Sequence, residues 1–165
     1  MKNITTLIIS TLFIATFGFG QTTYVPDDNF EQALIDQGYD DVLDDYVLTV
    51  NISTVIYLNV AGYNVSDLTG IEGFTALTNL ICYENQLTSL DVSANTALTY
   101  LAVHDNQLTS LDVSNNTALT KVYCNSNQLT TLDVSANTAL TYLAVYYNQL
   151  TYLNMKNGVT DALTT

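Results

Sequence analysis

Positive charge is scarce in this chain of 165 residues. It has three lysines, one histidine and no arginine against 16 acidic residues, which gives a formal net charge of -13. Eight of the acidic residues lie between Asp27 and Asp45, so the negative charge is concentrated near the amino terminus. Such a chain repels the phosphates of nucleic acids and of anionic lipids. The composition therefore argues against nucleic-acid binding and favours a neutral or positively charged partner.

Long apolar segments are also missing after the first twenty residues. Nothing there approaches the roughly 18 consecutive apolar residues of a transmembrane helix. The amino terminus itself combines Lys2, an apolar stretch from Leu7 to Phe19 and the small-x-small motif Gly18-Phe19-Gly20. This pattern is typical of a secretory signal peptide. We therefore predict that residues 1–20 are removed and that the protein is secreted or displayed at the cell surface, without membrane insertion.

A 21-residue unit, by contrast, recurs four times between residues 77 and 160. Its apolar positions follow the spacing L-x-x-L-x-L-x-x-N-x-L, and a fixed period near 20 is typical of a leucine-rich repeat solenoid. An irregular copy of 22 residues, 55–76, precedes the four, and residues 161–165 begin another that is not completed. We therefore expect a piece of a longer array that self-associates through an uncapped carboxy-terminal edge. In the second copy the apolar frame consists of Leu98, Leu101, Val103, Leu108 and Leu111.

These features predict an α/β solenoid, a right-handed leucine-rich repeat horseshoe with a parallel β-sheet on its concave face. Because 21 residues leave no room for a full helix on the return side, the convex side is expected to be extended or 3₁₀. Residues 21–54 are predicted to form an N-terminal helical cap and an acidic turn, and residues 55–165 the repeats. The cap helix is expected to start at Asp28, with Glu31 completing a capping box.

The two cysteines, Cys82 and Cys124, share one repeat position two periods apart. Parallel strands stack about 4.8 Å apart, so the thiols are expected roughly 10 Å from each other, beyond the reach of a disulfide. Valine takes the same position in the other copies, at Val103 and Val145. We therefore predict free, buried thiols that act as small apolar side chains.

Several polar residues also recur in columns. The asparagine column is predicted to form a structural ladder that pairs buried backbone groups. Each aspartate of a second column is expected to cap its own convex turn, with calcium binding as a weaker alternative. The acidic turn of residues 40–45 lacks the spacing of an EF-hand loop. Regular threonine columns raise the less favoured prospect of an ice-binding array. The asparagines are Asn85, Asn106, Asn127 and Asn148, and the aspartates are Asp91, Asp112 and Asp133.

The outward positions of the predicted strands vary between copies, whereas the convex wording is almost unchanged. A uniform scaffold with a variable, tyrosine-rich face is what a binding surface would look like, since tyrosine offers large contact area at low entropic cost. The alternative is that aromatic residues merely suit strands. The predicted ligand-binding residues are Tyr83, Tyr100, His104, Asp105, Tyr123, Tyr142, Tyr146 and Tyr147.

The repeats, together with the leading residues 64–80, resemble those of internalin-like bacterial leucine-rich repeat proteins. The wording Asn-Gln-Leu-Thr-Ser-Leu-Asp-Val-Ser at 85–93 is similar to that of exported repeat proteins of gliding Gram-negative bacteria. The resemblance implies recognition of a protein or glycan, often in adhesion, without a cofactor.

Two other function classes compete with recognition. A calcium-rigidified structural spacer of a larger surface protein is the main alternative. A hydrolase is much less favoured, because His104 beside Asp105 has no serine or cysteine nucleophile on its face. The prediction is therefore a non-catalytic binding protein.

Overall fold

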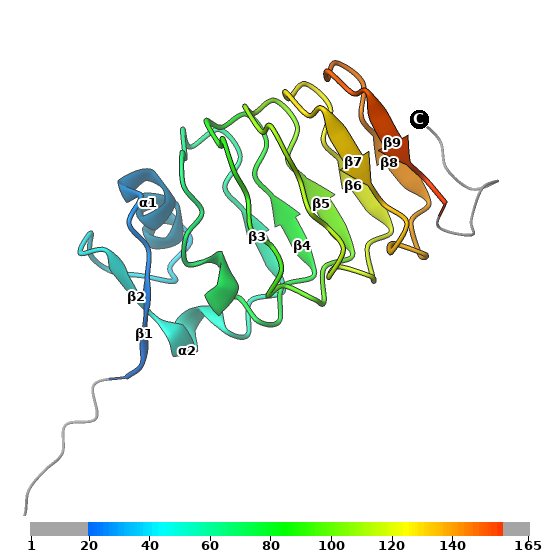
Figure 1. The fold of residues 1–165 in the computed structure, drawn as a ribbon. Coiled ribbons are helices and arrows are strands. Elements are labelled where there is room, and N and C mark those ends of the chain that lie inside the picture. The colour runs from blue at the N-terminus through cyan, green and yellow to red at the C-terminus, as the bar shows by residue number, and fades with distance from the viewer. Residues whose placement is uncertain (1–19, 157–165) are drawn as a thin grey trace, which may run out of the picture.

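The computed structural model describes residues 20–156, which form an N-terminal cap followed by a row of stacked coils (Figure 1). The predicted signal peptide, apart from Gly20, and the unfinished repeat at 161–165 lie outside the described residues. The cap contains β1 (Thr22–Tyr24), α1 (Asp28–Asp36), β2 (Tyr46–Leu48) and α2 (Thr49–Ile52). The coils contain β3 (Tyr57–Asn59), η1 (Ile71–Gly73), β4 (Asn79–Ile81), β5 (Tyr100–Ala102), β6 (Lys121–Tyr123), β7 (Thr131–Asp133), β8 (Tyr142–Ala144) and β9 (Tyr152–Asn154).

One strand from each coil joins a five-stranded parallel sheet in the order β3-β4-β5-β6-β8. Each strand is displaced from its neighbour by one whole repeat, so equivalent residues face each other. The central residue of every strand points into the core and is fully buried, while the residues on either side point to the concave face. The leucine-rich repeat solenoid predicted from the apolar spacing is therefore confirmed. The central residues are Leu58, Leu80, Leu101, Val122 and Leu143.

The return side of the coils contains turns and short extended segments, as expected for a 21-residue period. In the described part of the chain its one helical element is η1, a 3₁₀ turn in the irregular first coil. Further along, β7 pairs in parallel with β9. A valine in each regular return segment faces the core, at Val92, Val113 and Val134, and all three are fully buried.

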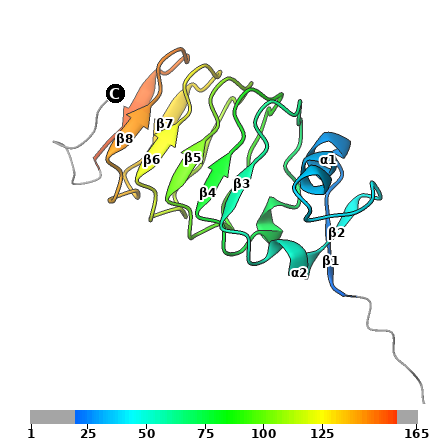
Figure 2. The same cartoon turned by 180° about the vertical axis from the view of Figure 1, so that it is seen from behind.

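The cap closes the first coil, as both views show (Figures 1 and 2). Helix α1 buries Phe30, Ala33 and Leu34, and the ring of Phe30 lies 6.3 Å from that of Phe74 in the first coil. An antiparallel pair, β1 with β2, completes the cap. The sequence did not indicate these strands, because three-residue strands leave almost no periodic signal.

The predicted start of the cap helix was wrong by one residue. Asp27, not Asp28, is the N-cap, and its carboxylate accepts hydrogen bonds from the backbone N–H groups of Asn29 and Phe30. The Glu31 side chain does not close a capping box. It turns instead toward the loop before β2 and accepts bonds from the backbone N–H groups of Asp44 and Tyr46. Tertiary contact thus outcompeted the local motif.

Both cysteines are free and fully buried, which confirms the prediction made from their spacing. Burial disfavours the charged thiolate and raises the pKa of Cys82 and Cys124 to about 12. Neither side chain therefore offers a reactive thiolate near neutral pH.

Candidate functional site

The asparagine column lies at the bend that follows each strand of the sheet. The Asn106 side chain spans two coils: its Oδ1 accepts from the N–H of Leu87 at 3.0 Å, and its Nδ2 donates to the carbonyl of Cys82 at 3.0 Å. Nδ2 also donates to two carbonyls of its own coil. Asn85, Asn127 and Asn148 repeat this pattern. The ladder therefore holds the loops beside the concave face at a constant spacing.

A second asparagine ladder runs along the opposite turn of the coils. Asn95, Asn116 and Asn137 are fully buried, and each Nδ2 donates to carbonyls of the preceding coil. The sequence interpretation assigned this position to a convex turn and missed its role. A signal was present, because asparagine stands three residues after the buried valine in each of three copies.

A threonine column links the coils as well. The hydroxyl of Thr120 donates to the backbone carbonyl of Thr99, which is its equivalent in the preceding coil, at 2.9 Å. Thr78, Thr99 and Thr141 make the same contact one coil apart. These hydroxyls are engaged within the protein, which supports a structural role for the column over an ice-binding one.

Three of the predicted binding residues form one tyrosine cluster on the concave face. The ring of Tyr123 lies 5.5 Å from that of Tyr100 and 4.8 Å from that of Tyr142, measured between centroids. Strand register places Ala102 and Ala144 on either side of Tyr123. Both alanines are almost fully buried although they point away from the core. Small neighbours therefore leave space for the large rings to cover this part of the sheet.

The other five predicted residues form two further groups along the next row of the concave face. The rings of Tyr83 and His104 are stacked at 4.4 Å, and Nδ1 of His104 lies 2.7 Å from Oδ2 of Asp105. This hydrogen bond lowers the pKa of the Asp105 carboxyl. Tyr146 and Tyr147 meet edge to face at 5.1 Å and are 55% and 80% exposed.

A strained backbone position runs along the same face. Glu84, Asp105, Ser126 and Tyr147 have φ angles of 54°, 54°, 53° and 54°. This left-handed conformation is uncommon for residues other than glycine and asparagine. The residue immediately before each ladder asparagine is therefore held in a costly conformation by the repeat itself, and its side chain points outward at the loop.

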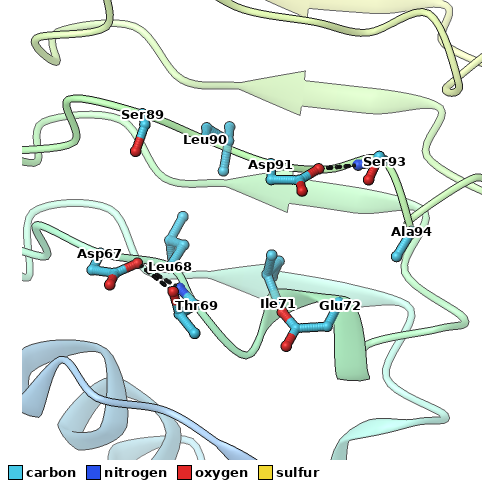
Figure 3. A pocket seen from close by; sticks show the side chains of 10 residues that line it. All are labelled: Asp67, Leu68, Thr69, Ile71, Glu72, Ser89, Leu90, Asp91, Ser93 and Ala94. Atoms are coloured by element: carbon cyan, nitrogen blue, oxygen red, sulfur yellow. Dashed lines mark hydrogen bonds between the residues drawn. The ribbon is translucent and has the colours of Figure 1, made fainter.

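The aspartate column lies on the convex side and is occupied by local hydrogen bonds. The backbone N–H of Ser93 donates to Asp91 at 2.9 Å, and Ser114 and Ser135 donate in the same way to Asp112 and Asp133. These serine contacts lower the pKa of all three carboxyls. Figure 3 shows Asp91 and Asp67 bonded to neighbouring residues in a pocket on this side. Within residues 20–156, the group of acidic oxygens close enough to share a metal ion lies elsewhere, at Asp28, Glu31 and Asp45.

The described part of the chain contains no helix long and apolar enough to span a membrane.

Comparison with known proteins places these features among bacterial leucine-rich repeat proteins. A family model described as the LVIVD repeat matches residues 88–124, which is fewer than two coils. Internalin J of Listeria monocytogenes is 40% identical over 84 residues, which are 48% of this chain and 9% of that protein. The chain thus spans a small part of the curated relative that it matches.

Solved structures give the same picture. The functional domain of InlJ from Listeria monocytogenes superposes with a TM-score of 0.66 at 35% identity, covering 82% of this chain and 36% of that one. InlF from the same organism gives 0.66 at 26% identity over 79% and 43%. A leucine-rich repeat protein of Leptospira interrogans gives 0.53 at 27% identity over 58% and 26%. Sequence similarity, sheet and ladders together support an internalin-like leucine-rich repeat protein.

Proposed function

We propose that this chain is an exported, non-catalytic recognition module whose concave face binds a protein ligand. The observation that carries the proposal is the contrast between the two faces of each coil. Convex residues repeat almost unchanged and bond to one another, whereas concave residues differ from coil to coil and form the exposed aromatic groups described above. Similarity to internalins supports the same class of function.

The tyrosine cluster is suited to binding because it is already organised. Tyr100, Tyr123 and Tyr142 contact one another across three adjacent strands, so little side-chain freedom remains to be lost when a partner docks. Rigid aromatic side chains near the centre of an interface usually contribute most of the binding free energy. The cluster is therefore the proposed anchor of the interface.

The flanking charges suggest what the partner surface contains. Glu84 and Asp105 lie on the neighbouring loops, and Lys121 is the one lysine on the strands of the described sheet. The overall charge of -13 adds a long-range negative field. A partner with basic residues around an apolar patch complements this face, and electrostatic attraction speeds association with such a partner.

The left-handed loop position is a second, independent support. Glycine would adopt this conformation without strain, yet the four regular coils carry Glu, Asp, Ser and Tyr there. Strained backbone positions are concentrated at binding and catalytic sites. The side chains at this position are thus proposed to extend the interface beyond the strands.

Point variants tested against a captured ligand would decide the assignment. After a protein ligand is identified on a protein array, Tyr123→Ala is expected to weaken its affinity by about thirtyfold, equivalent to roughly 2 kcal/mol, because a central anchor is lost. Tyr24→Ala, at an exposed tyrosine of the cap, and Ser114→Ala, on the convex side, are expected to change it little. Weakening by the two control variants but not by Tyr123→Ala would contradict a concave site. Binding to a glycan array alone would identify a carbohydrate ligand and refute the protein partner.

Export is a separate part of the proposal and rests on residues 1–20. The exported protein is expected to begin at Gln21, which amino-terminal sequencing would test. An origin in gliding Gram-negative bacteria and self-association through the last coil stay predictions from the sequence.

A further inference from the structure

We propose that Asp28, Glu31 and Asp45 bind a calcium ion that joins the cap helix to the loop before β2. This site is separate from the concave face and from the convex aspartate column. It also differs from the acidic turn considered in the sequence, because two of its three ligands come from the first turn of α1.

The starting point is a buried carboxylate with one unpaired oxygen. Glu31 has no solvent-accessible surface. Its Oε1 accepts hydrogen bonds from the N–H groups of Asp44 and Tyr46 at 3.0 and 3.1 Å. Its Oε2 is buried and has no hydrogen-bond partner. An unpaired charged oxygen out of contact with water is costly, so a ligand that satisfies Oε2 would be held strongly.

Two further carboxylates surround that oxygen at metal-binding distances. One oxygen each from Asp28, Glu31 and Asp45 lie within 4.8 Å of one another. Two oxygens that share a calcium ion at about 2.3 to 2.6 Å are at most about 5 Å apart. Asp28 and Asp45 are exposed, so water molecules can reach the site and complete the six to eight oxygen ligands that calcium typically takes.

The protein supplies no positive charge to this cluster. Its lysines are Lys2, outside the described residues, and Lys121 and Lys156, both within the solenoid. The negative charge near Glu31 is high, because burial first and then the charges of Glu31, Asp41 and Asp44 raise the pKa of Asp40. A bound cation would compensate several of these charges at once.

The acidic residues are not explained by helix capping. Asp27 already fills the N-cap position and accepts the free N–H groups of the first turn. Glu31 faces the loop before β2 rather than the helix terminus. Carboxylate oxygens without sulfur or nitrogen ligands suit a hard cation, and a site shared between a helix and a loop suits the flexible geometry of calcium better than the octahedron of magnesium.

The test compares melting temperatures in calcium and in a chelator, together with direct calcium titration by calorimetry. The protein is expected to bind one equivalent of calcium and to melt about 5 °C higher than in EDTA, with a smaller shift in magnesium at equal ionic strength. Glu31→Gln keeps the shape of the side chain but removes its charge. It is expected to abolish the calcium-dependent shift while leaving the melting temperature in EDTA equal or higher.

Glu84→Gln is the matched control, since it makes the same chemical change at an exposed site, and it should retain the full calcium response. Asp45→Asn is a second test that keeps the backbone, because asparagine tolerates the φ angle of 67° at this position. This variant is also expected to lose the response. No calcium binding by the wild-type protein would overturn the proposal, and so would a full calcium shift in both Glu31→Gln and Asp45→Asn.

Discussion

The N-terminal cap and the regular coils are held together in different ways. In the coils each contact recurs every 21 residues, so an asparagine or threonine bond has equivalents above and below it. In the cap each contact occurs once. The Asp27 carboxylate alone accepts bonds from Asn29, Phe30, Ser66 and Asp67, and thereby joins α1 to the first coil. Single substitutions should therefore be more damaging at the junction than within the array.

The largest effect is expected where the first coil approaches the cap. Gly70 has a φ angle of 104°, and a Cβ there would lie 2.7 Å from the backbone oxygen of Tyr24. Gly70→Ala should therefore lower the free energy of unfolding by about 4 kcal/mol, from both backbone strain and overlap. Gly62→Ala is the control, because Gly62 also has a positive φ but open space around it, and should cost only about 1 kcal/mol. Denaturant unfolding measures both, and equal losses would contradict the tight junction.

Removal of the Asp27 carboxylate is the next largest expected effect. Asp27→Ala should cost about 3 kcal/mol, because it leaves the helix terminus and two N–H groups of the first coil unpaired. Asp36→Ala, at the exposed end of the same helix, should change stability by a few tenths of a kcal/mol. A similar loss from both variants in urea would show that Asp27 is not the connecting residue.

Acid should reveal the same contact. Burial opposes ionisation of Asp27, but its bonds from Ser66, Phe30 and Asp67 prevail and lower its pKa below the ordinary value of 3.8. A lowered pKa in the folded state contributes stability that is present above pH 3.8 and is lost as the pH falls through the folded value. The stability difference between the wild-type protein and Asp27→Asn should therefore shrink below about pH 4. A difference that does not change with pH would argue against an ionised Asp27.

Within the array, loss of one ladder asparagine should have an intermediate effect. Asn106→Ala should cost about 2 kcal/mol, because it leaves the N–H of Leu87 and several buried carbonyls unpaired. Asn115→Ala, at an exposed convex position, should cost less than about 0.5 kcal/mol. Thermal unfolding of the two variants tests the comparison, and an unchanged midpoint for Asn106→Ala would remove the ladder from the account of stability.

The smallest effect is expected at the buried thiols. Cys124→Val should change stability by less than about 1 kcal/mol, because valine fills the same position at Val103 and Val145. A thiol reagent should modify neither cysteine in the native protein and both after denaturation, since burial raises each thiol pKa to about 12. Rapid modification of the native protein would show that the coils open.

The fold was predictable where the chain repeats itself, and much less so in the cap. Leu101 and Asn106 recur at the same interval as their equivalents, and a fixed period forces equivalent residues into columns whatever the details of the coil. Phe30 and Glu31 have no equivalents elsewhere in the chain. Their partners, Phe74 and the N–H groups of Asp44 and Tyr46, are distant in sequence and no spacing rule connects them.

The sequence by itself determined the solenoid, the inward leucines, the separation of the two thiols and which tyrosines face outward, because all of these follow from the 21-residue period. Tertiary structure alone decided that Tyr123 lies between Tyr100 and Tyr142, that the asparagines of the return turns form a second ladder, and that Glu31 turns away from its own helix terminus. Each of these depends on which neighbours leave space or offer a hydrogen bond across the fold. Such contacts join residues by distance in space, which periodicity along the chain does not specify.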